Sequence, residues 1–349
     1  MQSINKLPVE IVFSPSWWYK HTGITFDKDF FFNPRKRVES ERRMELELYN
    51  RFGKYGLGAE HSKDVPQLGA VHLASGYLLS EMLGCEVIYS ESAPPQVVCA
   101  NQAELSVDTE KAFSSSIFKE VEKLADALKA QYGYLRGDIN WSGVLNLALD
   151  LRGESIFMDM MMEPEKVKQY FGQLAEVCEK FTRYVEALTG STSISVNRNV
   201  INLAKPVLLH SECSHTMISE EMYEEFLLPI DAKWSAEHAA FGIHHCGKDP
   251  HRFAAAYAKL PHLAFLDLGW GGDVKLLREH LPNTFLNIRL DPVTIGSQSL
   301  SEIENSIVKL VGESNDPMQT GVCCINMDDK VSDEKVIAIF ETATRVVNG

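Results

Sequence analysis

From about residue 205 onward, short β-rich runs alternate with segments of helical character. The runs are PVLLH (206–210), FGIHH (241–245), LAFLDL (263–268), TFLNIRL (284–290) and TGVCCI (320–325). Strands that are joined by helices pair in parallel, because each helical crossover returns the chain to the same end of the sheet. Five consecutive β-then-α units therefore predict a parallel sheet covered by outer helices.

Helical signals support the segments between and around these runs. After the fourth run the apolar side chains recur at helical spacing, and Ser301 with Glu304 fits a capping box. Ser219 is predicted to cap the helix that follows it. A charged helix is predicted for about 36–52, and Pro164 is predicted to begin a long amphipathic helix.

The first two hundred residues are less regular. LPVEIVF (7–13) is typical of a strand, and LRGDINWSG (135–143) of a strand end and a loop that leads into a helix. We find no linker, low-complexity tract or internal repeat. The sequence predicts a single α/β domain over 1–349, a (β/α)8 barrel with an N-terminal elaboration at about 1–95.

Ionisable side chains collect where the β-rich runs end. In a β/α barrel the chemistry takes place at the carboxyl ends of the strands, so this distribution favours an enzyme with its site on one rim. The residues concerned are His210, Glu212, Cys213, His244, His245, Cys246, Asp267, Arg289, Asp291, Cys323 and Cys324.

The second of these strand ends carries half of a zinc site. Side chains alternate between the two faces of a strand, so His244 and Cys246 are expected on one face and His245 on the other. Imidazole and thiolate are typical ligands of zinc. A third thiol comes from the last strand, where alternation lets only one of Cys323 and Cys324 face the interior, and the C-x-I pattern favours Cys323.

Several of these segments share the pattern of one superfamily. They are the helix ISEEMYEEFLLP (218–229), the strand LDLGW (266–270), the turn N-x-R-L-D-P (287–292) and the region from GDINWSG to KQYF (137–171). On these residues, the stretch from about 205 to 347 resembles the uroporphyrinogen decarboxylase superfamily, and the similarity covers about two thirds of the chain. The resemblance implies a (β/α)8 barrel.

Within that superfamily, the H-x-C-G element is similar to the zinc-dependent, corrinoid-linked methyltransferases, such as the methylcobalamin:coenzyme M enzymes. The resemblance implies zinc held by His244, Cys246 and a last-strand cysteine, Cys323 or Cys324. It also implies a corrinoid cofactor. The chain has no D-x-H-x-x-G signature for binding a corrinoid, so the cobalamin is expected to arrive on a partner protein. Cobalamin-independent methionine synthase uses a comparable set on the same barrel.

One departure from the superfamily pattern bears on the reaction. The decarboxylase itself holds its substrate's carboxylates with an arginine-rich N-terminal element, whereas here FSPSWWYKHTG (13–23) has aromatic residues and no arginine. A porphyrinogen would lose its main anchor, which favours methyl transfer over decarboxylation. Two alternatives stay open: a lyase, which predicts no metal, and a non-catalytic metal- or corrinoid-binding module, which predicts zinc without methyl transfer.

Asp267 and Glu212 are the candidates for catalysis. Asp267 either supplies a fourth ligand that substrate displaces or orients the zinc-bound histidine. Glu212 belongs with Cys213 to a competing cluster at 210–215, which we interpret as structural or in contact with substrate rather than as a second metal site.

Further residues are candidates for contact with substrate. Arg289 could bind a carboxylate or sulfonate, or form a salt bridge to Asp291 or Asp267. Aromatic residues after the first strand could line the pocket or pack in the core. The full set of candidates is Arg289, Trp17, Trp18, His210, His245 and Asn140.

Charge and composition limit the class of partner. The formal net charge is −14, which argues against a nucleic acid. No apolar run approaches the ~20 residues that span a bilayer, and seven cysteines without a disulfide-type spacing indicate a reducing, cytoplasmic location. The partners expected are a corrinoid protein and a small methyl donor or acceptor. The soft ligand set favours a thiol, while methylated ethers and amines stay open, as does the direction of transfer.

Overall fold

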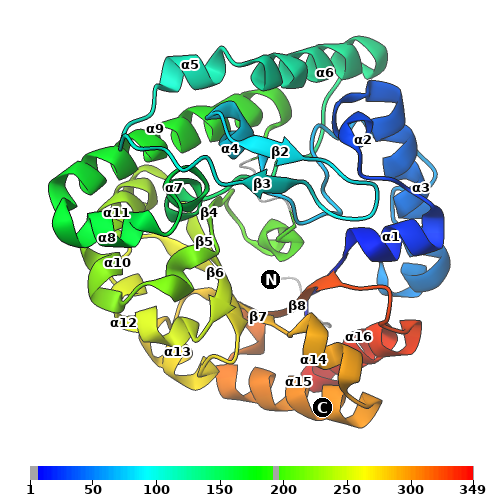
Figure 1. Cartoon of the computed structure of the whole chain (residues 1–349). Helices are drawn as coiled ribbons and strands as arrows, with labels where there is room; N and C mark the ends of the chain where they lie inside the picture. The colour runs from blue at the N-terminus through cyan, green and yellow to red at the C-terminus, as the bar shows by residue number, and fades with distance from the viewer. Residues whose placement is uncertain (1–6, 192–195, 349) are drawn as a thin grey trace.

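A computed structural model describes residues 7–191 and 196–348, and its centre is a curled parallel sheet (Figure 1). Neighbouring strands follow the order β1-β8-β7-β6-β5-β4. Their bounds are Val9–Phe13 (β1), Leu208–Glu212 (β4), Phe241–Lys248 (β5), Leu263–Trp270 (β6), Phe285–Arg289 (β7) and Thr320–Met327 (β8). The five runs after residue 205 and the run at 7–13 are therefore confirmed as strands, whereas the strand end predicted within 135–143 is not.

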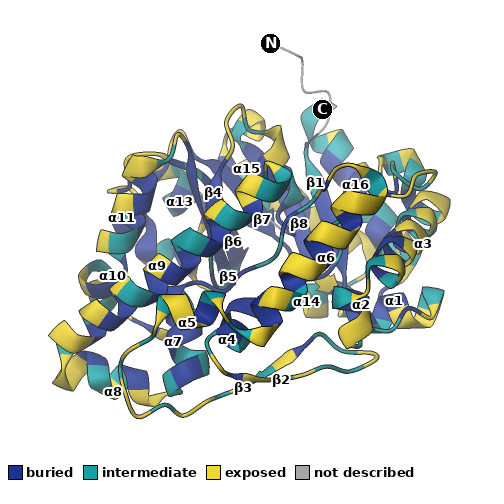
Figure 2. Ribbon diagram, turned by 90° about the horizontal axis from the view of Figure 1, so that it is seen from above, coloured by how far each residue is buried: buried dark blue, intermediate teal, exposed yellow. Residues whose placement is uncertain are grey.

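Helices surround this sheet. Along many of them, buried side chains alternate with exposed ones at helical spacing, so that one side of the helix is covered and the other faces solvent (Figure 2). Their bounds are Pro15–Thr22 (α1), Lys28–Phe32 (α2), Pro34–Phe52 (α3), Leu78–Met82 (α4), Thr109–Phe113 (α5), Ser116–Tyr132 (α6), Val144–Arg152 (α7), Ser155–Met162 (α8), Pro164–Thr189 (α9), Glu220–Phe226 (α10), Leu228–Glu237 (α11), Ala254–Tyr257 (α12), Val274–His280 (α13), Pro292–Ser297 (α14), Leu300–Ser314 (α15) and Asp333–Asn348 (α16). A small antiparallel hairpin, β2 (Glu86–Ile88) and β3 (Gln96–Val98), lies outside the main sheet.

The expected eight-stranded barrel is confirmed in only six strands. Within the described residues, the interval between β1 and β4 contains two segments, 65–76 and 134–142, that form no strand ladder. A single parallel bridge joins them, from Gln67 to Arg136. The second segment meets the sheet where the Gly143 amide donates to a carbonyl of β4 at 2.7 Å.

Glycine explains why these two segments approach each other without forming a ladder. A Cβ atom on Gly69 would lie 1.8 Å from the carbonyl oxygen of Asp138, so only glycine allows this contact. Gly137 has a φ of +78°, which breaks the extended conformation that a strand requires. The local backbone therefore prevents regular pairing at this part of the wall.

Helix boundaries agree with most of the sequence signals. Pro164 begins α9, and the Ser219 side chain accepts from the Met222 amide at the start of α10. The predicted capping box at Ser301 and Glu304 is wrong by two residues. The S-x-x-E pattern occurs twice in this segment, and α15 uses the earlier copy, Ser299 with Glu302.

In the part of the chain that the structure covers, no helix combines the length and the apolar character needed to cross a membrane.

Candidate functional site

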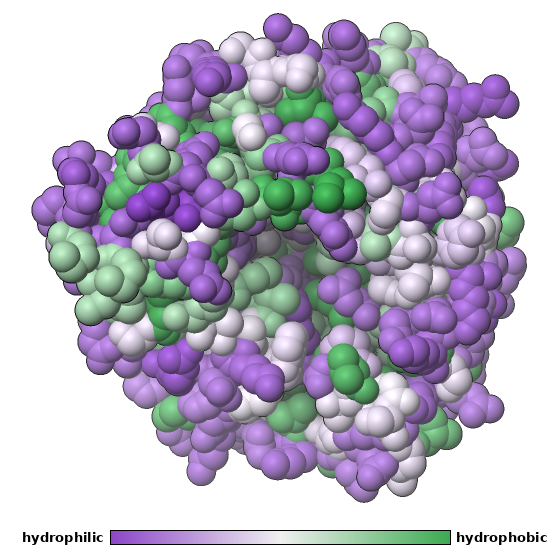
Figure 3. All heavy atoms as spheres, in the orientation of Figure 1, coloured by the Kyte–Doolittle hydropathy of each residue, from purple (hydrophilic) through white to green (hydrophobic). Residues whose placement is uncertain are grey.

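A cavity of about 460 Å³ opens at the carboxyl ends of the strands. Figure 3 shows the hollow at the centre of this face. This volume suits a small organic molecule. The lining comes from the strand ends, from α7 and from the β2–β3 hairpin, and it consists of Ala74, Gly76, Val97, Asn140, Trp141, Ser142, Asn146, Leu149, Asp150, Val196, Ser211, Cys213, Ser214, His244, Cys246, Arg289, Ile325 and Asn326.

Three soft donor groups meet in the wall of this cavity. Ligand atoms of Cys213, His244 and Cys246 all lie within 4.8 Å of one another. His244 and Cys246 share one face at the end of β5, and Cys213 directly follows β4, which pairs with β5 in parallel. The sequence therefore placed two of these residues together, and the pairing of the two strands supplies the third.

The imidazole of His244 is held through one ring nitrogen. Its Nδ1 lies 2.6 Å from Asn197 Oδ1 and 2.9 Å from Asp267 Oδ2. The β5–β6 register places His244 directly beside Asp267. Burial alone would lower the pKa of His244, but the Asp267 carboxylate raises it to about 9. A hydrogen bond that holds Nδ1 directs Nε2 towards the thiols, and this is the usual arrangement of a metal-binding histidine.

Arg289 is buried and is held by groups of the protein itself. Its Nε donates to Asp267 Oδ1 at 3.1 Å, its Nη2 also contacts that carboxylate, and its Nη1 donates to Cys246 Sγ at 3.1 Å. Of the alternatives that the sequence left open, the structure contains the salt bridge to Asp267. The guanidinium lines the cavity, but its charge is already matched, so it is not a free anchor for an anionic substrate.

The thiol of Cys246 is electrostatically favoured as a thiolate. A hydrogen bond from Cys213, together with the nearby Arg289 and His244, holds the pKa of Cys246 well below its usual range. The same pairing raises the pKa of Cys213. Cys213 is exposed and Cys246 is half-buried, so the pair can be reached from the cavity.

A second layer of polar groups lies beneath these residues. The Glu10 carboxylate accepts from the Asn199 amide at 2.6 Å and from Asn287 Nδ2 at 2.9 Å. Burial and the nearby Asp267 raise the pKa of Glu10 to about 7. Sequence reasoning missed this layer, although an acidic residue within the apolar run VEIVF was a visible signal. Nothing in the sequence marked Asn197 and Asn199 as members of this layer.

Cys323 belongs to this second layer rather than to the group at the cavity. Its thiol contacts Asp267 Oδ1 at 3.7 Å, and its donor atoms group with those of Glu10 and Asp267. Cys324 is fully buried on the other side of the strand, among apolar residues of the core. The alternation expected for this doublet is therefore present, but the inward-facing thiol lies below the Cys213–His244–Cys246 group.

His245 lies on the face of β5 opposite His244. It is fully buried, and its Nδ1 lies 3.0 Å from the Tyr257 hydroxyl. Burial lowers the pKa of His245 to about 4, so the imidazole is neutral at physiological pH. It does not line the cavity, and the expectation that it contacts substrate is not supported there.

His210 and Glu212 support the start of helix α7 instead of lining the cavity. The Leu145 amide donates to Glu212 Oε2 at 2.8 Å, and the Val144 amide lies 3.3 Å from His210 Nε2. His210 is fixed in turn by Asp231, which its Nδ1 contacts at 2.7 Å. Both side chains are fully buried, which agrees with the structural interpretation for these two residues, whereas Cys213 of the same cluster belongs to the donor group in the cavity wall.

Trp17 and Trp18 are core residues. Trp17 stacks on Phe13 with ring centroids 3.9 Å apart, and Trp18 Nε1 donates to the His72 carbonyl at 3.4 Å. Neither lines the cavity, so of the two alternatives the packing one describes them. Asn140, by contrast, does line the cavity.

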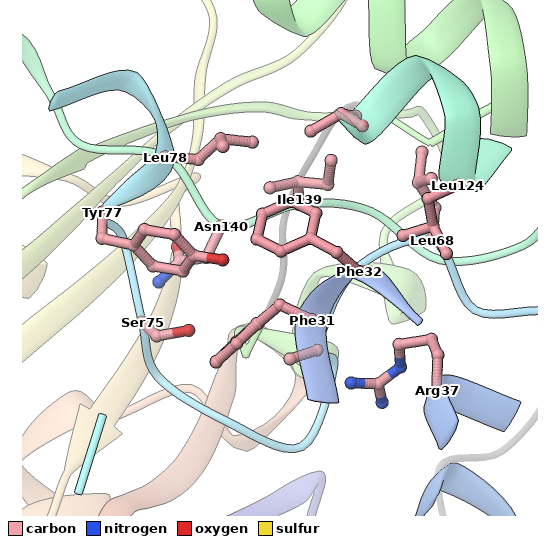
Figure 4. Close-up of a pocket in the computed structure, with 13 residues that line it drawn as sticks. Phe31, Phe32, Arg37, Leu68, Ser75, Tyr77, Leu78, Leu124, Ile139 and Asn140 are labelled. Carbon is pink, nitrogen blue, oxygen red and sulfur yellow. The ribbon is translucent and has the colours of Figure 1, made fainter. Parts of the chain in front are cut away.

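A second pocket lies between α2, α3 and α6, as Figure 4 shows. Phe31, Phe32 and Arg37 line one side of it, and Tyr77 and Asn140 the other. Its volume is only about 30 Å³, enough for roughly two water molecules. This pocket is therefore too small to be the site of a reaction on an organic substrate.

The donor set at the cavity fits a zinc ion. Two thiols and one imidazole nitrogen are available, and a catalytic zinc site needs three protein ligands and one open position. The Arg289 hydrogen bond to Cys246 is compatible with this, because a metal-bound thiolate still accepts hydrogen bonds. The carboxylate that holds His244 Nδ1 completes the usual support for such a ligand.

Comparison with known proteins gives structural matches alone. No protein-family model and no curated protein sequence matches the chain. Among solved structures, a methyltransferase from Methanosarcina mazei superimposes with a TM-score of 0.68 at 13% sequence identity, covering 97% of this chain and 94% of that one. A B12-independent methionine synthase from Shewanella sp. W3-18-1, in complex with selenomethionine, gives 0.52 at 10% identity, covering 98% and 97%. At these identities the likeness establishes the fold.

Proposed function

We propose that this protein is a zinc-dependent methyltransferase that moves a methyl group between a corrinoid carried by a partner protein and a small substrate. The observation that carries the proposal is the group of Cys213, His244 and Cys246 in the cavity wall, with donor atoms within 4.8 Å of one another. Of the two solved structures compared above, one is titled a methyltransferase and the other a B12-independent methionine synthase. The first title supports methyl transfer, and the corrinoid partner belongs to the proposal alone.

The zinc ligands that we propose are His244, Cys246 and Cys213. The family resemblance implied a last-strand cysteine, Cys323 or Cys324, as the third ligand, and strand alternation favoured Cys323. We favour Cys213 because its thiol belongs to the same donor group as the other two, whereas Cys323 contacts Asp267. A zinc ion bound there would keep a substrate thiol deprotonated or polarise a methylated heteroatom.

The surrounding residues position these ligands. Asp267 and Asn197 fix the ring of His244 through Nδ1. Arg289 donates to Cys246 Sγ and neutralises the buried Asp267 carboxylate, so that neither charge lies unpaired beneath the cavity. Asp267 thus has the role of orienting the histidine, which is one of the two that the sequence left open.

Metal analysis of single variants tests the ligand set. Wild-type protein is expected to contain about one zinc per chain, and Cys246→Ser and Cys213→Ser are expected to lose most of it. Cys323→Ser is the matched control, a buried thiol one layer below, and should keep its zinc. The reverse result for Cys213 and Cys323 would restore the ligand set that the resemblance implied.

Methyl transfer is tested by following the cobalt absorbance of methylcobalamin or of a methylated corrinoid protein. The panel of substrates contains thiols, aryl methyl ethers and methylated amines, and removal of zinc should abolish the change. A protein that binds zinc but transfers no methyl group would be a binding module. Metal-free decarboxylation of uroporphyrinogen would instead indicate the lyase.

A further inference from the structure

Asp150 is a carboxylate in the cavity wall without a cationic partner. It lies on α7, and one carboxylate oxygen accepts from the buried Ser80 hydroxyl at 2.6 Å. Among the described residues, no Lys, Arg or His forms an ion pair with it at 4.0 Å or less. A half-buried carboxylate is costly unless a cation or several donors compensate it.

The other charged groups at the cavity compensate one another. Arg289 is matched by Asp267, and His244 lies between Asp267 and the Cys246 thiol. No lysine occurs among the lining residues that the structure describes. The charge left over on the wall is therefore the negative charge of Asp150.

We infer that the small substrate of this cavity is a cation whose ammonium head lies against Asp150 and whose reacting thiol or methylated heteroatom lies towards the proposed zinc ligands. This inference rests on the proposed function for its chemistry and on the charge balance of the wall for its substrate class. It replaces the expectation of an anionic substrate held by Arg289. Asp150 and the thiols line the same 460 Å³ cavity, so the inference places both ends of one small molecule in that cavity.

The same distribution of charge on the cavity wall disfavours binding of an anionic substrate. An anionic substrate would have to approach the Asp150 carboxylate with no unpaired cation among the described lining residues to offset the repulsion. The net charge of −14 adds a long-range attraction for cations and a repulsion for anions.

Binding of two compounds of equal shape tests the inference. Choline and 3,3-dimethylbutan-1-ol differ only in the positive charge, and their Kd values would be measured by calorimetry on the full chain at pH 8. Wild-type protein should bind choline roughly tenfold or more tightly than the neutral alcohol, which is the effect expected of one charge-assisted contact. In Asp150→Asn, a near-isosteric variant, the two Kd values should become equal.

Three results would overturn the inference: equal Kd values for wild-type protein, a charge preference that persists in Asp150→Asn, or tighter binding of the anion 3,3-dimethylbutanoate. Cys246→Ser is the matched control, because it removes a proposed zinc ligand and should keep the preference for choline. Absence of methyl transfer in wild-type protein that still prefers choline would count against the proposed function and not against this inference. A circular dichroism spectrum and Tm like those of the wild type confirm that Asp150→Asn is folded.

Discussion

Replacing Arg289 by methionine should destabilise the protein strongly, because it removes one of the two cations, Arg289 and His244, that compensate the buried Asp267 carboxylate. The two side chains are 4% and 0% exposed and are joined by two hydrogen bonds. Breaking a buried ion pair by removing one partner costs about 3–5 kcal/mol. For a chain of 349 residues the entropy of unfolding is roughly 0.7 kcal/mol per degree, so Tm should fall by about 4–7 °C.

Thermal and urea denaturation of metal-free protein would measure this loss. The matched control is Arg345→Met, which breaks the exposed pair with Glu304 at 2.6 Å, where the side chains are 55% and 46% exposed. An exposed pair contributes about 0–1 kcal/mol, so this Tm should change by less than about 2 °C. A loss below about 1 kcal/mol in Arg289→Met would refute the argument that the buried guanidinium compensates Asp267.

A double-mutant cycle and acid titration isolate the pair itself. Arg289→Met combined with Asp267→Asn should be less destabilised than the sum of the single variants by about 2 kcal/mol or more, since the second change removes the unpaired charge. Burial alone would raise the pKa of Asp267, but Arg289 and His244 hold it well below its usual range. This contribution to stability is present above the ordinary carboxyl pKa, so the difference between wild type and Arg289→Met should narrow as the pH falls below about 4.

Two further predictions concern the face of each strand and the buried layer. Elemental analysis of His245→Phe and Cys324→Ala should show a full complement of zinc. Loss of metal in either variant would mean that the opposite face of that strand points towards the cavity. The folded state raises the pKa of Glu10 to about 7, so it binds more protons than the unfolded state between about pH 4.5 and 7. The free energy of unfolding of metal-free protein should therefore decrease as the pH rises through that range, by up to about 1.4 kcal/mol per pH unit. In Glu10→Gln, urea midpoints measured over the same range should lack this pH-dependent decrease.

The strands could be predicted because each is a short apolar run separated from the next by a helical pattern. A parallel strand is buried on both faces, as β7 is throughout, so its sequence is almost continuously apolar. Segments 65–76 and 134–142 have neither this run nor a regular period, since glycine and close backbone contacts determine their path. The two additional strands that would close an eight-stranded barrel were therefore predicted without a supporting pattern in the sequence.

The site could be predicted as far as neighbouring residues determine it. Alternation along one strand was enough to associate His244 with Cys246. The identity of the third thiol depends on which distant strand end lies closest to His244 and Cys246. Three cysteines fit the sequence pattern: Cys213 at the end of β4, and Cys323 and Cys324 on β8. Arg289 has Asp267 and Asp291 within plausible reach, and only the β6–β7 register decides between them.

The pairing of β1 with β8 has a consequence for the order in which the chain folds. Val9 lies beside Val322, so the first strand has to wait for nearly the whole polypeptide before its place in the sheet exists. Strands β4 to β8 pair with sequential neighbours and can assemble from local contacts as they leave the ribosome, which favours rapid formation. Glu10 reaches its place with the first strand, so the polar layer beneath the cavity is completed only at that closing step, and a nascent chain that stops short of β8 lacks this layer.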